Sequence, residues 1–151
     1  MAANIFNAKD YQGISSRLSK VNAQSSRQWG TMTPAQTLRH CRAQIDFILS
    51  PSPHVKVYPT PFRFAPVRWF ALYGMAWPKN SKTAPELDVN KKLNDTGEFQ
   101  EEYNLLTEAL KKLTLRDEVI AVHPLFGRLG HKDWGRVVWK HLDHHLRQFG
   151  V

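Results

Sequence analysis

The C-terminal segment combines the apolar period of a helix with two histidines on the face expected to be buried. At about 100° per residue, its apolar and charged positions fall on opposite sides of a helix. The apolar side holds Trp134, Val138, His141, Leu142, His145 and Phe149, and the charged side holds Arg136, Lys140, Asp143 and Arg147. Buried imidazoles are costly unless their nitrogens are satisfied. Because residues four apart on a helix point the same way, His141 and His145 favour a shared divalent metal ion.

Four segments have the spacing of amphipathic helices, over residues 8–24, 34–49, from after Asp95 to about 113, and 132–149. Thr33, Pro34 and Gln36 form the start signal of the second helix, as a capping box with proline in its first turn. Asp95 and Glu98 suggest a second capping box, before the third helix.

The lengths of the connections predict how these helices are arranged. Residues 51–95 form a long crossover, of which Phe62 to Trp77 is expected to hold one short helix. The other connections are short, which favours antiparallel neighbours, whereas the crossover lets the second and third helices run parallel. No strand pattern competes. We therefore expect an all-α protein in which residues 1–151 form a single domain, an up-down-down-up four-helix bundle.

This topology places a third histidine beside the C-terminal pair. The second and fourth helices would be antiparallel, so His40 should lie at the same level as His141 and His145. A three-histidine metal site is therefore geometrically allowed. His123 and His131 precede or begin the fourth helix and are expected at the opposite end of the bundle.

Four other residues have weaker claims to the site. His54 lies in the crossover and has no predicted position. His144 falls at the edge of the apolar face, which favours a supporting or surface position over a ligand. Gln148 would orient a ligand ring by a hydrogen bond or end the helix facing solvent. Cys41 points about 100° away from His40 and is expected to be a core residue.

Three neutral imidazoles leave a metal ion its full charge and an open coordination position. Such a site lowers the pKa of water toward about 7 or accepts a thiolate. Zinc, nickel and iron all suit imidazole ligands. A closed structural zinc site would need a fourth protein ligand, and none is evident in the sequence.

Charge and composition restrict the partners. The net charge of +8 arises from dispersed basic residues, and the chain has no helix-turn-helix, zinc-finger or RNA-binding strand motif, so a solvated surface is favoured over nucleic-acid binding. No run is long enough to span a membrane, and the N-terminus lacks the pattern of a secretory signal. A single cysteine fits a reducing cytoplasm, where we expect the protein.

Four motifs resemble the DinB-like superfamily, within the branch catalogued as domain of unknown function 1569. They are W-G-x-M-T-P-A-Q-x-L-x-H (29–40), N-S-K-T-A-P-E (80–86), H-P-L-F-G-R-L (123–129) and W-K-H-L-D-H-H-L-R-Q-F-G-V (139–151). The resemblance covers nearly the whole chain. It implies an up-down-down-up bundle, often dimeric, with His40, His141 and His145 as metal ligands and Gln148 as the glutamine that follows them.

The resemblance also implies a class of reaction. Characterised members of the superfamily include transferases and isomerases that use low-molecular-weight thiols such as bacillithiol, mycothiol or glutathione. A similar metal-dependent enzyme here would be a thiol S-transferase or a hydrolase acting on a small electrophilic molecule. Its mouth is expected near Trp29 and residues 95–102, where Glu98, Glu101 or Glu102 would be a base or a solvated carboxylate. The alternative is a non-catalytic module that binds metal or senses stress.

Overall fold

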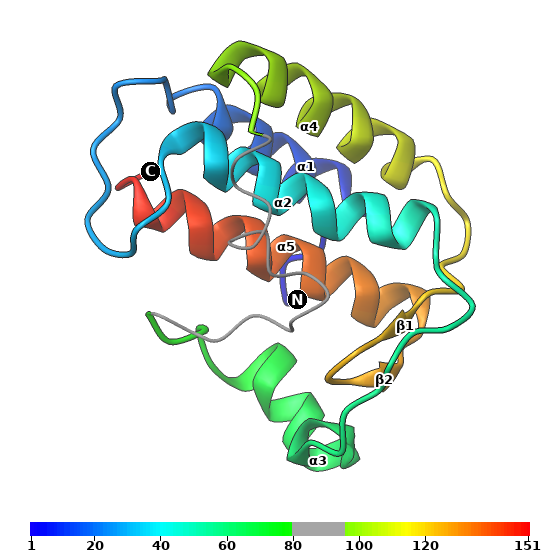
Figure 1. The fold of residues 1–151 in the computed structure, drawn as a ribbon. Helices are drawn as coiled ribbons and strands as arrows, with labels where there is room; N and C mark the ends of the chain where they lie inside the picture. Colours follow the sequence, from blue (N-terminus) through cyan, green and yellow to red (C-terminus); the bar gives the residue numbers. More distant parts are fainter. Residues whose placement is uncertain (80–95) are drawn as a thin grey trace.

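The computed structural model describes residues 1–79 and 96–151, and it confirms a mostly helical chain (Figure 1). The α-helices are α1 (Ala8–Leu18), α2 (Pro34–Leu49), α3 (Ala65–Trp69), α4 (Phe99–Thr114) and α5 (His131–Gln148). A 3-10 turn, η1 (Pro61–Arg63), precedes α3, and a π-helical turn, η2 (Phe70–Gly74), follows it. Strands β1 (Val122–His123) and β2 (Gly127–Arg128) pair as an antiparallel hairpin. Within the two described ranges, no helix has both the length and the apolar character needed to cross a bilayer.

Helices α1, α2, α4 and α5 pack against one another around an apolar core (Figure 1). α2 contacts both α4 and α5, and α1 contacts α5. In the apolar stripe predicted for the third helix, Leu106, Leu110 and Leu113 are each at most 1% exposed, and Phe99 and Tyr103 are partly buried against the core. Burying one such side chain contributes about 1.5–3 kcal/mol. This core fixes α2 against α5, the two helices that carry the histidines.

The first helix is shorter than predicted, because it ends at Leu18 and not near residue 24. Polar side chains beyond its end offer the backbone other hydrogen bonds. The amide of Asn22 donates to Ser25 Oγ, and Asn22 Oδ1 accepts from the amide of Gln24. Val21 nevertheless reaches the core at 5% exposure. The periodic spacing of apolar residues thus extends to Val21, beyond the end of the helix at Leu18, and this made the predicted helix too long.

The predicted capping box at the start of α2 is confirmed. Thr33 Oγ1 accepts from the amide of Gln36, and the amide of Thr33 donates to Gln36 Oε1. The box predicted before α4 differs from the structure. Glu98 is itself the residue at the cap position and makes no side-chain cap bond, while Asp95 lies outside the described residues.

The hairpin was missed by the sequence analysis, which expected no strands. Its two-residue strands are too short for an alternating pattern to be recognised. The hairpin holds the beginning of the crossover, because the amide of Tyr58 donates to Pro124 O and Thr60 Oγ1 donates to Leu125 O. The short helix expected between residues 62 and 77 is present as α3, close to the hairpin in Figure 1.

Candidate metal centre

Three buried histidines from two helices meet inside the protein. His40 comes from the second turn of α2, and His141 and His145 are one turn apart on α5. The Nε2 atoms of His40 and His141 are 2.9 Å apart. One ligand nitrogen from each ring lies within 4.8 Å of the others. The predicted meeting of these residues is therefore confirmed, and they are close enough to hold a metal ion.

The chemistry of the cluster fits a divalent cation. Two adjacent imidazole ligands at metal–nitrogen distances of about 2.1 Å have nitrogens about 3.4 Å apart in tetrahedral geometry and about 3.0 Å apart in octahedral geometry, close to the separation of His40 and His141. Burial, reinforced by the neighbouring histidines, lowers the pKa of His141 well below its usual value. Burial also lowers the pKa of His145 to about 3. Both rings are therefore neutral near pH 7, and neutral imidazole is the form that coordinates metals.

Gln148 fixes the tautomer of His145. The amide nitrogen of Gln148 donates to Trp29 O at 2.7 Å, so its Oε1 is the atom 3.0 Å from His145 Nδ1. A carbonyl oxygen can only accept, so His145 Nδ1 carries the proton and donates it. The lone pair of His145 then lies on Nε2. Orienting a ligand ring in this way is common in metal sites. His141 differs, because its buried Nδ1 has no hydrogen-bond partner in the described part of the chain.

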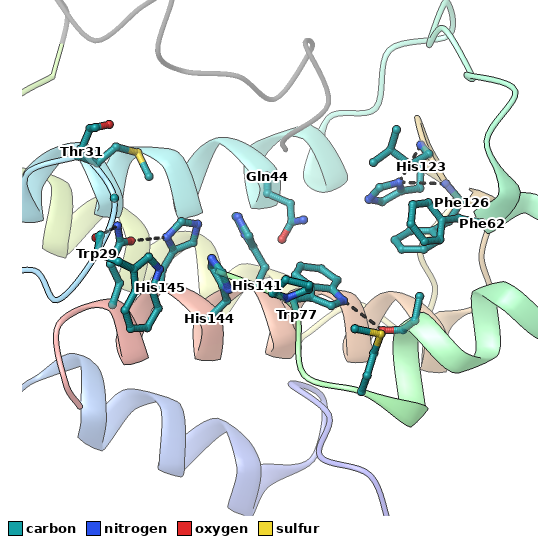
Figure 2. A pocket seen from close by; sticks show the side chains of 17 residues that line it. Trp29, Thr31, Gln44, Phe62, Trp77, His123, Phe126, His141, His144 and His145 are labelled. Carbon is teal, nitrogen blue, oxygen red and sulfur yellow. Dashed lines mark hydrogen bonds between the residues drawn. The ribbon is translucent and has the colours of Figure 1, made fainter. Parts of the chain in front are cut away.

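A cavity of about 350 Å³ borders the cluster (Figure 2). Its described walls include His141 and His145, the loop around Trp29, Trp77 of the crossover, and Phe126 of the hairpin. Apolar and aromatic side chains predominate in this lining, as in sites for small molecules. The cavity gives a small ligand the space to lie beside the histidines.

His123 lies beside the start of α5, where its ring packs on Trp134, at the end of the bundle opposite the cluster as predicted. The sequence did not predict that it would line the same cavity as His141 and His145. Figure 2 shows it with Phe62 and Phe126 at one end of the cavity, with His145 and Trp29 at the other. The shared cavity was not foreseen because it depends on the unpredicted hairpin, which carries His123 and Phe126 into the cavity wall.

His144, for which the sequence favoured a supporting or surface position, is buried and lines the cavity. It is 8% exposed, and its ring packs edge-on against that of His145. Burial lowers its pKa, and a hydrogen bond with the backbone of Trp77 opposes that shift. His144 lies outside the group of three that could share an ion.

The carboxylates considered as bases are absent from the described lining of this cavity. Glu102 is 3% exposed and is ion-paired with Arg42 at 3.1 Å. Neither Glu98 nor Glu101 is among the described residues of the cavity wall, whereas the part of the predicted mouth around Trp29 lines it, with Trp29, Gly30, Thr31 and Met32.

The remaining candidates have ordinary structural positions. Cys41 lies in the apolar core, as predicted, and burial raises the pKa of its thiol. His131 contacts Arg116 O and stacks on Phe6, remote from the cluster as expected. His54 is exposed in the crossover. The motif at residues 80–86 lies outside the described residues.

Comparison with protein families gives one match, to the family described as "Protein of unknown function (DUF1569)", over residues 7–150. The chain belongs to this family. No curated protein and no solved structure matches the chain. Because the description of DUF1569 assigns no activity, the reaction has to be inferred from the histidine cluster and its cavity.

Proposed function

We propose that this DUF1569 protein is a metal-dependent enzyme in which His40, His141 and His145 hold a divalent ion, zinc, nickel or iron. The ion would activate water or a low-molecular-weight thiol for attack on a small electrophile, as in a hydrolase or a thiol S-transferase. One observation carries the proposal: three buried, converging imidazoles lie at the wall of a cavity of about 350 Å³. An ion with a purely structural role has no need of such a space.

The protein's own residues have separate roles in this proposal. A divalent ion supplies Lewis acidity, which lowers the pKa of a water or thiol nucleophile. Gln148 accepts a hydrogen bond from His145 Nδ1 and so leaves His145 Nε2 free to bind the ion. Gln148 is itself held by its hydrogen bond to Trp29 O. Trp77, whose ring lies 6.4 Å from that of His141, would exclude water from the space beside the cluster.

The proposal extends to the fold and the assembly. The contacts of α2 with α4 and α5, and of α1 with α5, support one domain with the up-down-down-up bundle arrangement. The small-molecule substrate, the cytoplasmic location and the homodimer remain predictions from the sequence and its resemblance. Light scattering on the purified protein tests the dimer.

Metal content is the first test. Protein purified without a metal-affinity tag should contain about one equivalent of zinc, nickel or iron by elemental analysis. His141→Ala should lose the metal, and His131→Ala, on the same helix but outside the cluster, should keep it. Equal metal content in both variants would refute the site.

A second test separates catalysis from a structural or sensing role. We expect metal-loaded protein to accelerate the reaction of glutathione or bacillithiol with a chromogenic aryl halide, or the hydrolysis of an activated ester. His40→Ala should abolish turnover while circular dichroism still reports a folded helical protein. Absence of turnover, with a large fall in melting temperature on chelation, would instead favour the non-catalytic module.

A further inference from the structure

His123 stands at the end of the cavity away from His145, and no role in metal binding involves it (Figure 2). It is the last residue of β1 and is only 4% exposed. Its ring is packed between Phe126 and Trp134, with ring centroids 4.7 and 5.3 Å away. The ring is therefore held in one orientation at the cavity wall.

The hairpin fixes the tautomer of this ring. The backbone amides of Leu125 and Phe126 both donate to His123 Nδ1, at 3.1 and 3.3 Å. An amide N–H only donates, so Nδ1 must present its lone pair. Burial lowers the pKa of His123 to about 3, so the ring is neutral near pH 7. A neutral ring with an unprotonated Nδ1 carries its hydrogen on Nε2.

This leaves an N–H donor on a residue of the cavity wall. Within the described residues, both side-chain hydrogen bonds of His123 involve Nδ1, on the other side of the ring. An N–H at the cavity wall that no described protein acceptor occupies can donate to an oxygen atom of a ligand in the cavity. Aromatic side chains line this space, since the Phe126 and Phe62 ring centroids are 5.5 Å apart and Trp77 lies 6.4 Å from the ring of His141. Gln44 lies between His123 and the cluster in Figure 2.

We propose that this end of the cavity binds the oxygen acceptor of an uncharged aromatic carbonyl compound, with His123 Nε2–H as the hydrogen-bond donor. The aromatic body of the compound lies among Phe62, Phe126 and Trp77, and the rest of the molecule extends toward His141. This deepens the proposed function, on which it rests for the reaction at the other end, by naming the class of electrophile. The binding itself requires no metal.

Two probes of nearly the same shape test the donor. Acetophenone and α-methylstyrene differ in that a carbonyl oxygen replaces a methylene group. We expect metal-free protein, kept in a chelator, to bind acetophenone about threefold to tenfold more tightly, the worth of one neutral hydrogen bond. In histidine-labelled protein, acetophenone should also shift the ¹⁵Nε2 resonance of His123. Equal affinities, or no binding of either probe up to its solubility, would overturn the proposal.

Two substitutions separate the donor from the structural role of the ring. In His123→Asn, Oδ1 replaces Nδ1 as the acceptor for the Leu125 and Phe126 amides, but the Nε2–H is lost. In His123→Gln, the side-chain amide reaches the position of Nε2 but the turn loses its acceptor. The preference for acetophenone should disappear in the first variant and persist in the second, even if the second is less stable. A preference retained in His123→Asn would assign it to another group or to bound water.

The results can refute this inference and the proposed function separately. A carbonyl preference in a protein that never binds metal would refute the enzyme proposal and leave this inference standing. Metal binding and turnover without the preference would do the reverse.

Discussion

Gln148 is the residue through which the loop before α2 is coupled to the histidine cluster. Its side chain accepts from His145 and donates to Trp29 O. Gly30, which follows Trp29, has a φ of +81°, a backbone conformation that residues other than glycine rarely adopt. A Cβ built on Gly30 would lie 2.1 Å from Gln148 Nε2. The glycine thus permits both the turn and the close approach of the glutamine.

We therefore predict that Gly30→Ala weakens metal binding by about 10- to 100-fold, the usual effect of losing the partner that orients a ligand. Zinc affinity measured against a chromogenic chelator tests this. Gln148→Leu should give a similar loss without strain in the backbone. Gly13→Ala is the matched control, because a Cβ there meets nothing within 4 Å. It should leave zinc affinity unchanged and stabilise α1 by up to about 1 kcal/mol. A Gly30→Ala protein with normal affinity would refute the coupling.

At the scale of the elements, local signals located the helices well. Apolar period and capping residues predicted α2 within a residue at each end, and they predicted the buried stripe of α4. The end of α1 was wrong because the competing hydrogen bonds of Asn22 and Ser25 do not change the apolar period. The β1–β2 hairpin was missed because its pairing depends on a turn and on tertiary contacts with the crossover.

The cap of α2 makes a prediction at this scale. Thr33 begins the helix that carries His40 two turns later, and its hydroxyl satisfies the Gln36 amide. Thr33→Ala should lower the free energy of unfolding by about 1 kcal/mol, as for other lost caps. Urea denaturation of the metal-free protein measures this. Thr33→Ser keeps the acceptor and should lie within a few tenths of a kcal/mol of the parent. Equal losses in the two variants would show that the hydroxyl is not the cause.

At the scale of the whole molecule, the crossover is held over the bundle by polar contacts with α5. Lys140 was expected on the charged, outward side, but it is 4% exposed and its Nζ donates to Ala71 O and Met75 O. Arg136 donates to Leu72 O, and Tyr73 donates to Asp133. These contacts lie beside the segment that supplies Trp77 to the cavity. A helical wheel could not show them, because it assigns charged side chains to solvent.

The same difference of scale explains which parts of the site could be predicted. The His141 and His145 pair is local to one helix, and His40 required only the order and direction of the helices. The position of His123 depends on the hairpin, and the cavity depends on how the crossover packs, so neither follows from periodicity. The sequence Pro124 to Gly127 could have indicated a turn directly after His123. In the structure, His123 Nδ1 accepts hydrogen bonds from two backbone amides of this turn.

The buried imidazoles make the stability of the metal-free protein depend on pH. Above about pH 7, His123 and His145 are neutral in both the folded and the unfolded chain, so they leave the free energy of unfolding unchanged. Below their ordinary pKa of 6.5, the unfolded chain takes up protons that the folded rings, with pKa values of about 3, refuse. Each ring then lowers the stability by up to about 1.4 kcal/mol per pH unit, from about pH 6.5 down to about pH 3.

Urea denaturation in a chelator at pH 8, 7, 6 and 5 tests this prediction. The contribution of His123 and His145 to the free energy of unfolding should be nearly constant between pH 8 and 7. Below pH 6.5 it should fall increasingly steeply. His123→Asn removes one of the titrating rings while keeping the acceptor for the turn. Its slope below pH 6 should therefore be shallower than the parent's by up to about 1.4 kcal/mol per pH unit. Identical slopes would mean that His123 takes up a proton as readily in the folded protein as in the unfolded chain, which is incompatible with a neutral ring fixed by two backbone amides.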